Sequence, residues 1–137
     1  MRALVETMPA VAWTEIVDPA TDSARFAFIG PQVEEVFGYT SSELLAEPGH
    51  FFRLVHPDDR ERVIANNDRC NRTGEPWNEL YRVIHRDGSV RWILSHARRS
   101  ADETRPAWHG VAVDVTRDVA GGSLPVRIGE SAESGSI

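Results

Sequence analysis

The sequence predicts an α+β fold in which strands from both ends of the chain form one antiparallel sheet. Runs of β-branched and aromatic residues at 11–17 and 25–29 predict two strands near the start of the chain. Residues 77–99 form two more such runs on either side of Asp87-Gly88, a pair that supplies the positive φ angles of a tight hairpin turn. A further strand at 107–116 follows a short polar segment, and short segments with helical spacing lie in between.

The first elements in the chain are a short helix and a hairpin. Residues 1–8 have helical spacing at Leu4 and Met8 and stop at Pro9, which predicts a short helical lead-in. Residues 18–23 are rich in turn formers, so the strands at 11–17 and 25–29 are expected to pair as a hairpin.

Two short helices are predicted next. Residues 31–38 begin with proline, carry an apolar face and end at glycine, which is typical of a short capped helix. A second helix begins at Thr40 or Ser41, where Glu43 has the spacing of a capping box, and Pro48-Gly49 ends it. The apolar segment 50–55 is expected to form one irregular turn over the core.

The longest predicted helix starts at His56-Pro57 and runs to about Arg72, with Gly74 as its end. Two aspartates in its first turn face the positive end of the helix dipole. Its apolar stripe is weak, so we expect it to cover the core rather than cross it. The stripe consists of Val63, Ile64, Asn67 and Cys70.

Composition limits the possible classes of protein. A chain of 137 residues with 41% hydrophobic content is long enough for one core, so we expect one domain. The net charge of −6 argues against a nucleic-acid partner. No apolar run is long enough to span a membrane, and the single cysteine, Cys70, fits a reducing cytoplasm, where we expect the protein to act.

Four segments in register resemble a PAS domain with its C-terminal PAC segment. They are GPQVEEVFGYTSSELL at 30–45, HPDDRERV at 56–63, YRVIHRDGSVRWI at 81–93 and GVAVDVT at 110–116. The resemblance implies a five-stranded antiparallel sheet of order 2-1-5-4-3 with the helices across one face. It places the domain at 9–117 and leaves 118–137 as a flexible linker or tail. It also implies a sensory or partner-holding module whose effector domain lies outside this chain.

The resemblance assigns one face of the last two strands to a ligand cavity. Alternation puts Ser95, Trp108 and Ala112 on that face, and their neighbours there are small enough to leave space for a small apolar or aromatic ligand. A bulky change, Ala112→Trp, is therefore expected to abolish ligand uptake without preventing folding. The predicted cavity residues are Trp13, Phe28, Phe37, Tyr39, Phe52, Tyr81, Ile93, Ser95, Trp108 and Ala112.

The other face of the same strands is too apolar to be left in water, so we expect a homodimer through it. In the PAS family this surface usually receives an N-terminal helix or a second subunit. The predicted interface consists of Leu4, Met8, Trp92, Leu94, Val111 and Val113. A ligand-free module that only holds partners together is the alternative to a ligand sensor.

The cofactor remains unidentified, and the sequence argues against two that PAS domains carry. A covalent flavin adduct needs a cysteine before the long helix, but the matching region 50–55 has none. Cys70 lies near the helix end and is interpreted as a small semi-buried thiol. Haem needs an axial histidine on the long helix, which has none, and His56 before it is interpreted as a capping or packing residue.

The sequence gives less support to a metal site or to an enzyme than to a sensory module. His96 and His109 would stand opposite each other if residues 101–104 close the last hairpin, and Glu79 would join them if Asp87-Gly88 is a two-residue turn. A three-residue turn would move Glu79 to the opposite face. We interpret this row as a polar rim and not as a metal centre. Since neither a nucleophile elbow nor a phosphate loop is present, we expect no enzymatic activity.

Overall fold

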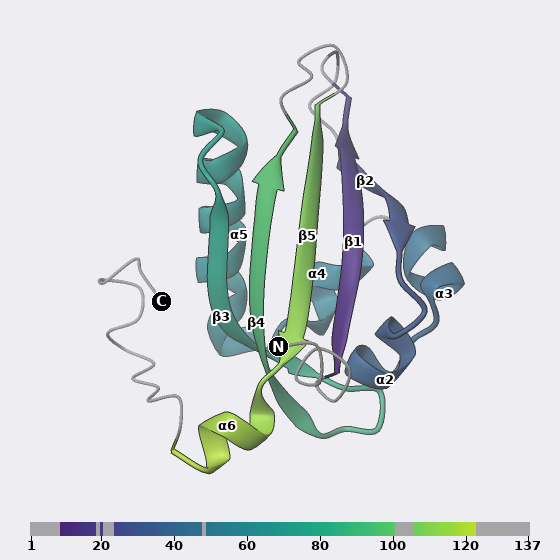
Figure 1. The fold of residues 1–137 in the computed structure, drawn as a ribbon, viewed down its shortest axis with the longest axis vertical. Helices are drawn as coiled ribbons and strands as arrows, with labels where there is room; N and C mark the ends of the chain where they lie inside the picture. Colours follow the sequence, from purple (N-terminus) through teal and green to yellow (C-terminus); the bar gives the residue numbers. More distant parts are fainter. Residues whose placement is uncertain (1–8, 19, 21–23, 48, 101–105, 123–137) are drawn as a thin grey trace, which may run out of the picture.

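The computed structural model describes residues 9–18, 20, 24–47, 49–100 and 106–122. One antiparallel sheet of five strands has the order β2-β1-β5-β4-β3, which confirms the predicted topology. Figure 1 shows the strands side by side, with β5 in the middle between β1 and β4. The strands are β1 (Ala10–Val17), β2 (Ala24–Ile29), β3 (Trp77–Ile84), β4 (Val90–Arg99) and β5 (Ala107–Asp114). The predicted helix at 1–8, with Leu4 and Met8, lies outside the described residues.

Among the described residues, all helices but the last lie between β2 and β3 in the chain and pack against the sheet, and the last follows β5. Thr40 caps α3 as predicted: its Oγ1 accepts from the Glu43 backbone N–H at 3.2 Å, and Glu43 Oε1 accepts from the Thr40 N–H at 2.9 Å. The expectation of an irregular turn at 50–55 was wrong, because His50–Leu54 forms a helical turn that begins after Gly49. The helices are α2 (Val33–Phe37), α3 (Ser41–Ala46), α4 (His50–Leu54), α5 (Pro57–Thr73) and α6 (Thr116–Ala120).

The long helix α5 begins and ends as the sequence predicts. The His56 ring accepts from the Asp58 N–H at 3.1 Å as the N-cap, which confirms its capping role, and Gly74 ends the helix at a φ of 79°. The buried stripe differs from the predicted one. Ile64 is exposed, whereas Asp59 is fully buried together with Val63 and Cys70. Asp59 is buried because it pairs with the neighbouring strand.

Asp59 joins α5 to the edge strand β3. Its Oδ2 accepts from the Arg82 backbone N–H at 2.8 Å, and its Oδ1 accepts from the Arg82 guanidinium at 2.7 Å. Arg62, one turn further along α5, donates to the Leu80 carbonyl of the same strand at 3.2 Å. In Figure 1, α5 runs along β3 at this side of the sheet. The helix thus satisfies backbone groups that an edge strand would otherwise present to another chain.

The turn between β3 and β4 contains three residues. The His85 N–H donates to the Ser89 carbonyl at 2.8 Å, which leaves Arg86, Asp87 and Gly88 as the loop, and Gly88 has a φ of 90°. Glu79 therefore pairs with Ser95 and lies on the helix-covered face. This outcome decides between the two registers that the sequence left open.

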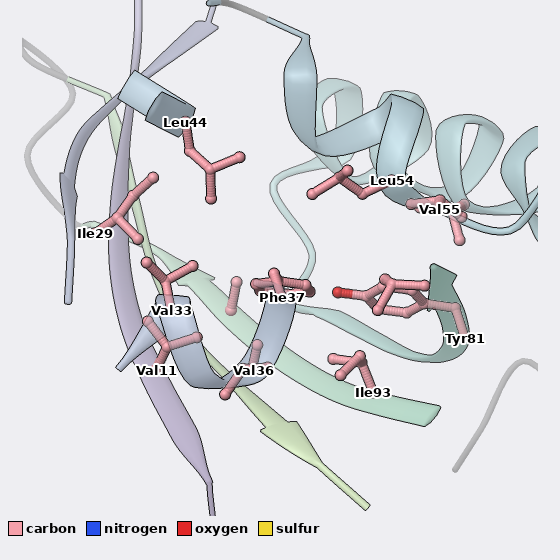
Figure 2. Close-up of a cluster of buried hydrophobic side chains, with 14 of the residues drawn as sticks. Val11, Ile29, Val33, Val36, Phe37, Leu44, Leu54, Val55, Tyr81 and Ile93 are labelled. Atoms are coloured by element: carbon pink, nitrogen blue, oxygen red, sulfur yellow. The ribbon is translucent and has the colours of Figure 1, made fainter. Parts of the chain in front are cut away.

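The core lies between the sheet and the helices. Figure 2 shows Val11 and Ile93 from the sheet facing Val36, Phe37 and Leu44 from the helices. On β4 and β5 the inner positions Ser95, Ala97 and Trp108 are buried, which agrees with the predicted alternation.

The chain continues past β5 as the short helix α6, which crosses the predicted boundary at residue 117. Asp114 stabilises the connection between β5 and α6: its Oδ1 accepts from the Thr116 N–H at 2.9 Å, and its Oδ2 accepts from Arg91 at 3.0 Å. The predicted flexible segment therefore begins in a helix at residues 118–120. Among the helices of the described residues, none has the length and apolar character needed to cross a membrane.

Candidate ligand-binding cavity

A small cavity of about 50 Å³ lies between the inner face of the sheet and the helices. Most of its wall is aromatic or aliphatic, and its polar side chains are few. A smaller second space adjoins it beside Trp108 and Cys70. The lining residues of the main cavity are Val11, Trp13, Glu15, Phe26, Ile29, Val33, Phe37, Leu44, Phe51, Phe52, Asn67, Trp77, Tyr81 and Ala112.

A β-bulge in β2 decides which of its aromatic residues reach the cavity. Trp13 pairs with Ile29 and Thr14 with Phe28, but Glu15 pairs with Phe26, so Ala27 is the extra residue. Phe26 and Ile29 consequently share the inner face, and Phe28 is on the outer face with 51% of its surface exposed. The prediction that Phe28 lines the cavity was wrong, because simple alternation along the strand does not foresee the bulge.

Gly110 gives Trp13 its place in the cavity wall. A Cβ atom at position 110 would lie 2.3 Å from the Trp13 ring, so only glycine leaves room for the indole on this part of β5. The Trp13 ring makes edge contacts with Phe26 at 5.7 Å and with Trp77 at 6.4 Å between ring centroids. Three strands and α4 thus contribute to one aromatic wall, since Phe51 of α4 contacts Phe26 at 6.4 Å.

The polar groups of the cavity differ in how well they are paired. The Tyr81 hydroxyl is hydrogen-bonded to Ser95 Oγ at 2.8 Å, and burial raises the pKa of this tyrosine above its ordinary range. The indole N–H of Trp77 is buried and has no hydrogen-bond partner among the described residues. The side chains of Glu15 and Asn67 are partly buried, and neither makes a side-chain hydrogen bond within the described part of the chain. Desolvation raises the pKa of Glu15 to about 7.

The predicted cavity residues take five different positions. Trp13, Phe37, Phe52, Tyr81 and Ala112 line the main cavity. Ile93 and Ser95 are buried behind that wall, and Trp108 borders the second space. Tyr39 packs beside the core under the Arg86 guanidinium, 4.9 Å from its ring centroid, and does not line the cavity. Phe28 is on the other face of the sheet, as described above.

Several cavity residues were absent from the prediction. Glu15 shares the inner positions of β1 with Val11 and Trp13, so the alternation of that strand carried the signal for it. Phe51 was missed because segment 50–55 was not recognised as a helix. The contribution of Asn67 depends on how α5 lies on the sheet, which no local pattern specifies.

The residues present do not fit a flavin adduct at the expected position. α4 and the first turn of α5 contain no cysteine, and Cys70 is buried at the far end of α5. Desolvation also raises the pKa of the Cys70 thiol, which disfavours a reactive thiolate. His56 Nδ1, the nearest candidate for a haem ligand, already accepts the α5 cap hydrogen bond.

The histidine row that suggested a metal site does not form. In the last hairpin His96 pairs with Val111, and His109 pairs with Arg98. The prediction assumed a four-residue connection at 101–104, but Ser100 pairs with Ala107, so the connection is the six residues 101–106. His96 instead contacts the Asn78 side chain, and His109 lies 3.2 Å from Thr14 Oγ1. Within the described ranges, no group of three or more potential ligands is arranged to hold a metal ion.

The outer face of the sheet carries the predicted interface residues of β4 and β5. Trp92, Leu94 and Val113 are partly exposed there, and Val111 exposes 38% of its surface. The Arg82 guanidinium lies 5.4 Å from the Trp92 ring centroid. The register also puts Phe28, Ile84 and Val90 on this face, so the apolar surface extends to β2 and β3.

The strand order, the helices on one face and the cavity beneath them define an α+β domain built on a single antiparallel sheet. The chain belongs to the PAS family. A family model described as PAS fold matches residues 26–112, which is more than half of the chain.

The proteins that this chain is similar to are signalling proteins or domains of them. The chain is 32% identical over 88 residues to the blue-light-activated histidine kinase of Brucella ovis, a match that covers 62% of this chain and 17% of that kinase. The chain thus spans less than a fifth of that relative. The N-terminal domain of a Marinobacter aquaeolei diguanylate cyclase with a PAS/PAC sensor is 25% identical, with a TM-score of 0.67 and coverage of 80% and 97%. A Burkholderia thailandensis sensory box histidine kinase/response regulator is 26% identical, with a TM-score of 0.63 and coverage of 89% and 88%.

Proposed function

We propose that this chain is the sensory module of a signal-transduction protein and that it binds a small apolar or aromatic ligand in the cavity between sheet and helices. The main support for the proposal is that the apolar wall of the cavity contains a buried polar atom without a hydrogen-bond partner. Buried polar groups in folded proteins are normally hydrogen-bonded, yet the Trp77 indole N–H has no partner among the described residues. A ligand or a bound water would satisfy it.

The size of the cavity limits the ligand. About 50 Å³ is less than the roughly 150 Å³ of an engineered cavity that binds benzene in another protein. A ligand with an aromatic ring therefore requires the wall to move outward. Phe51 and Phe52 are the side chains we expect to move, because both are partly exposed on the short helix α4.

The known relatives support a signalling role for this chain. The kinase and the cyclase that it resembles are named for output activities, and the Marinobacter match is to an N-terminal sensor region. We propose that a comparable effector lies outside this chain, and that the chain itself is not an enzyme. The single cysteine is consistent with our placing the protein in the cytoplasm.

Native mass spectrometry of freshly purified protein tests ligand binding. The comparison is between the wild type and Ala112→Leu, which adds a side chain to the cavity wall, where Ala112 is 2% exposed. We chose leucine over the bulkier tryptophan because the cavity is small. Ala12→Leu makes the same chemical change at an exposed position of β1 and is the matched control.

A bound organic mass that is present in the wild type and Ala12→Leu but lost in Ala112→Leu would support the sensor proposal. A wild type without bound mass would favour the alternative, a ligand-free interaction module. That alternative has its own observation in the exposed apolar residues of the outer face, through which we propose that the chain forms a homodimer.

A further inference from the structure

Glu15 lies at the junction of the main cavity and the smaller space beside Trp108. It is a partly buried side chain on the inner face of β1, between the inward-facing Trp13 and the end of the strand. Trp13 and Trp77 border both spaces, as Glu15 does, and Phe26 and Trp108 are its cross-strand partners on β2 and β5. A single carboxyl group is therefore surrounded by aromatic rings from four strands.

The described part of the chain does not supply a cation to this carboxyl group. Of the three arginines of α5 nearest Asn67 in sequence, Arg62 pairs with Asp59 and Glu79, and Arg69 pairs with Glu75 at 3.1 Å. The third, Arg72, is exposed, and no ion pair joins it to Glu15 within the described residues. No ion pair or hydrogen bond to Glu15 is formed among the described residues. Desolvation consequently raises the pKa of Glu15 to about 7.

A partly desolvated carboxylate without a partner is destabilising, and this free-energy cost falls when a cation enters beside it. Aromatic faces attract cations as well, through the negative potential of the ring. Asn67 offers a further acceptor, because its side chain lines the same two spaces and its amide oxygen can accept a hydrogen bond from an ammonium group. A carboxylate, an amide oxygen and several indole and phenyl rings together form a site suited to an ammonium group.

We propose that the ligand is a small organic amine whose aromatic or apolar body lies among the cavity rings and whose ammonium group donates hydrogen bonds to Glu15 and Asn67. This inference rests on the proposed ligand-binding function and specifies its chemical class. An organic anion would be repelled by Glu15, and a purely apolar ligand would leave the carboxyl group unpaired.

Two probes of equal size separate the contribution of the ammonium group to binding affinity from that of the apolar body. Benzylamine and ethylbenzene have the same number of non-hydrogen atoms, and only benzylamine is protonated at neutral pH. Their dissociation constants are measured by titration followed with ¹H–¹⁵N NMR at pH 8, where most of the Glu15 carboxyl group is ionised. We expect benzylamine to bind the wild type about tenfold more tightly than ethylbenzene, as one charge-assisted hydrogen bond allows.

Glu15→Gln keeps the shape of the side chain and removes its charge. We expect it to abolish the preference for benzylamine and to leave ethylbenzene binding within about twofold. Because the protein has a net charge of −6, any loss of one carboxylate weakens cation binding slightly. Glu61→Gln, at an exposed position of α5, makes the same change in net charge and is expected to retain the preference.

The outcomes distinguish this inference from the function on which it rests. Binding of ethylbenzene as tight as that of benzylamine would overturn the amine assignment and leave the cavity sensor in place. A preference for benzylamine that persists in Glu15→Gln would overturn the role of Glu15. Failure of both probes to bind the wild type would contradict ligand binding itself. The wild-type comparison requires no variant, so it stands even if Glu15→Gln is unstable.

Discussion

Glu15 and Asp59 are both carboxylates at the contact between sheet and helices, and their surroundings move their pKa values in opposite directions. Desolvation raises the pKa of Glu15 to about 7, with no partner among the described residues to offset it. Burial would also raise the pKa of Asp59, but hydrogen bonds and charge from Arg82 outweigh it, so the pKa of Asp59 lies below its ordinary value. The first carboxyl group is available to a ligand, and the second holds the fold together.

The raised pKa of Glu15 makes stability depend on pH. Between the ordinary carboxyl pKa near 4.5 and about 7, the folded state binds more protons at Glu15 than the unfolded state. The free energy of unfolding therefore falls as pH rises through this window. Urea unfolding should show Glu15→Gln to be more stable than the wild type by about 1 to 3 kcal/mol at pH 8, with a much smaller difference at pH 4. Equal differences at both pH values would show that Glu15 is not desolvated.

At the scale of single residues, the sequence predicts which side chains are buried better than it predicts what they do. Alternation along β4 and β5 grouped Ser95, Ala97 and Trp108 on one face, and the resemblance to PAS domains identified that face as the inner one, where all three are buried. It failed for Phe28, because the bulge at Ala27 shifts the phase of β2 by one residue. The unpaired state of Glu15 could not be predicted at all, since it depends on which side chains α5 and β3 bring near it.

At the scale of elements, α5 is attached to β3 by the Arg62–Glu79 and Asp59–Arg82 ion pairs, and Asp59 is the most deeply buried of these four residues. Asp59→Ala would leave the Arg82 guanidinium and its backbone N–H without their acceptor, so we expect a loss of about 3 to 5 kcal/mol in the free energy of unfolding. Asp58→Ala is the matched control, because Asp58 is its exposed neighbour in the same helical turn. Its loss should not exceed about 1 kcal/mol. Chemical denaturation of both variants measures the difference, and similar losses would contradict a specific role for the Asp59–Arg82 pair.

The ends of the helices were predictable because the signals are local. The capping box at Thr40, the proline at the start of α5 and the glycine at its end each act within one helical turn. The registers of the hairpins were not predictable to the same degree. Asp87-Gly88 located the first turn, but both two- and three-residue loops suit that pair, and the longer connection at 101–106 has no comparable signal.

At the scale of the whole molecule, the four segments that resemble a PAS domain predicted the strand order, which local patterns alone do not specify. The sheet divides the molecule into a helix-covered face with a cavity and an outer face that carries exposed apolar side chains. A ligand on one face and a partner on the other would both act on β5, where Ala112 lines the cavity and Val111 is exposed on the outer face.

If the chain dimerises through the outer face, a single charged substitution there should convert the dimer into a monomer. Val111→Glu introduces a charge into the centre of the apolar surface, and we expect sedimentation velocity to show a dimer for the wild type and a monomer for the variant. Leu45→Glu changes an exposed leucine on α3, away from the sheet, and should leave the dimer intact. A wild type that stays monomeric at high concentration would rule out the proposed interface.

The most direct test of the sensor proposal is a screen of small aromatic compounds by ¹H–¹⁵N NMR on wild-type protein and on Ala112→Leu. The account predicts that some compounds shift the wild-type signals of the cavity wall, the Trp77 indole N–H among them, and that Ala112→Leu abolishes these shifts while its spectrum stays that of a folded protein. Shifts of the same size in Ala112→Leu, or a wild type that responds to none of the compounds, would contradict it.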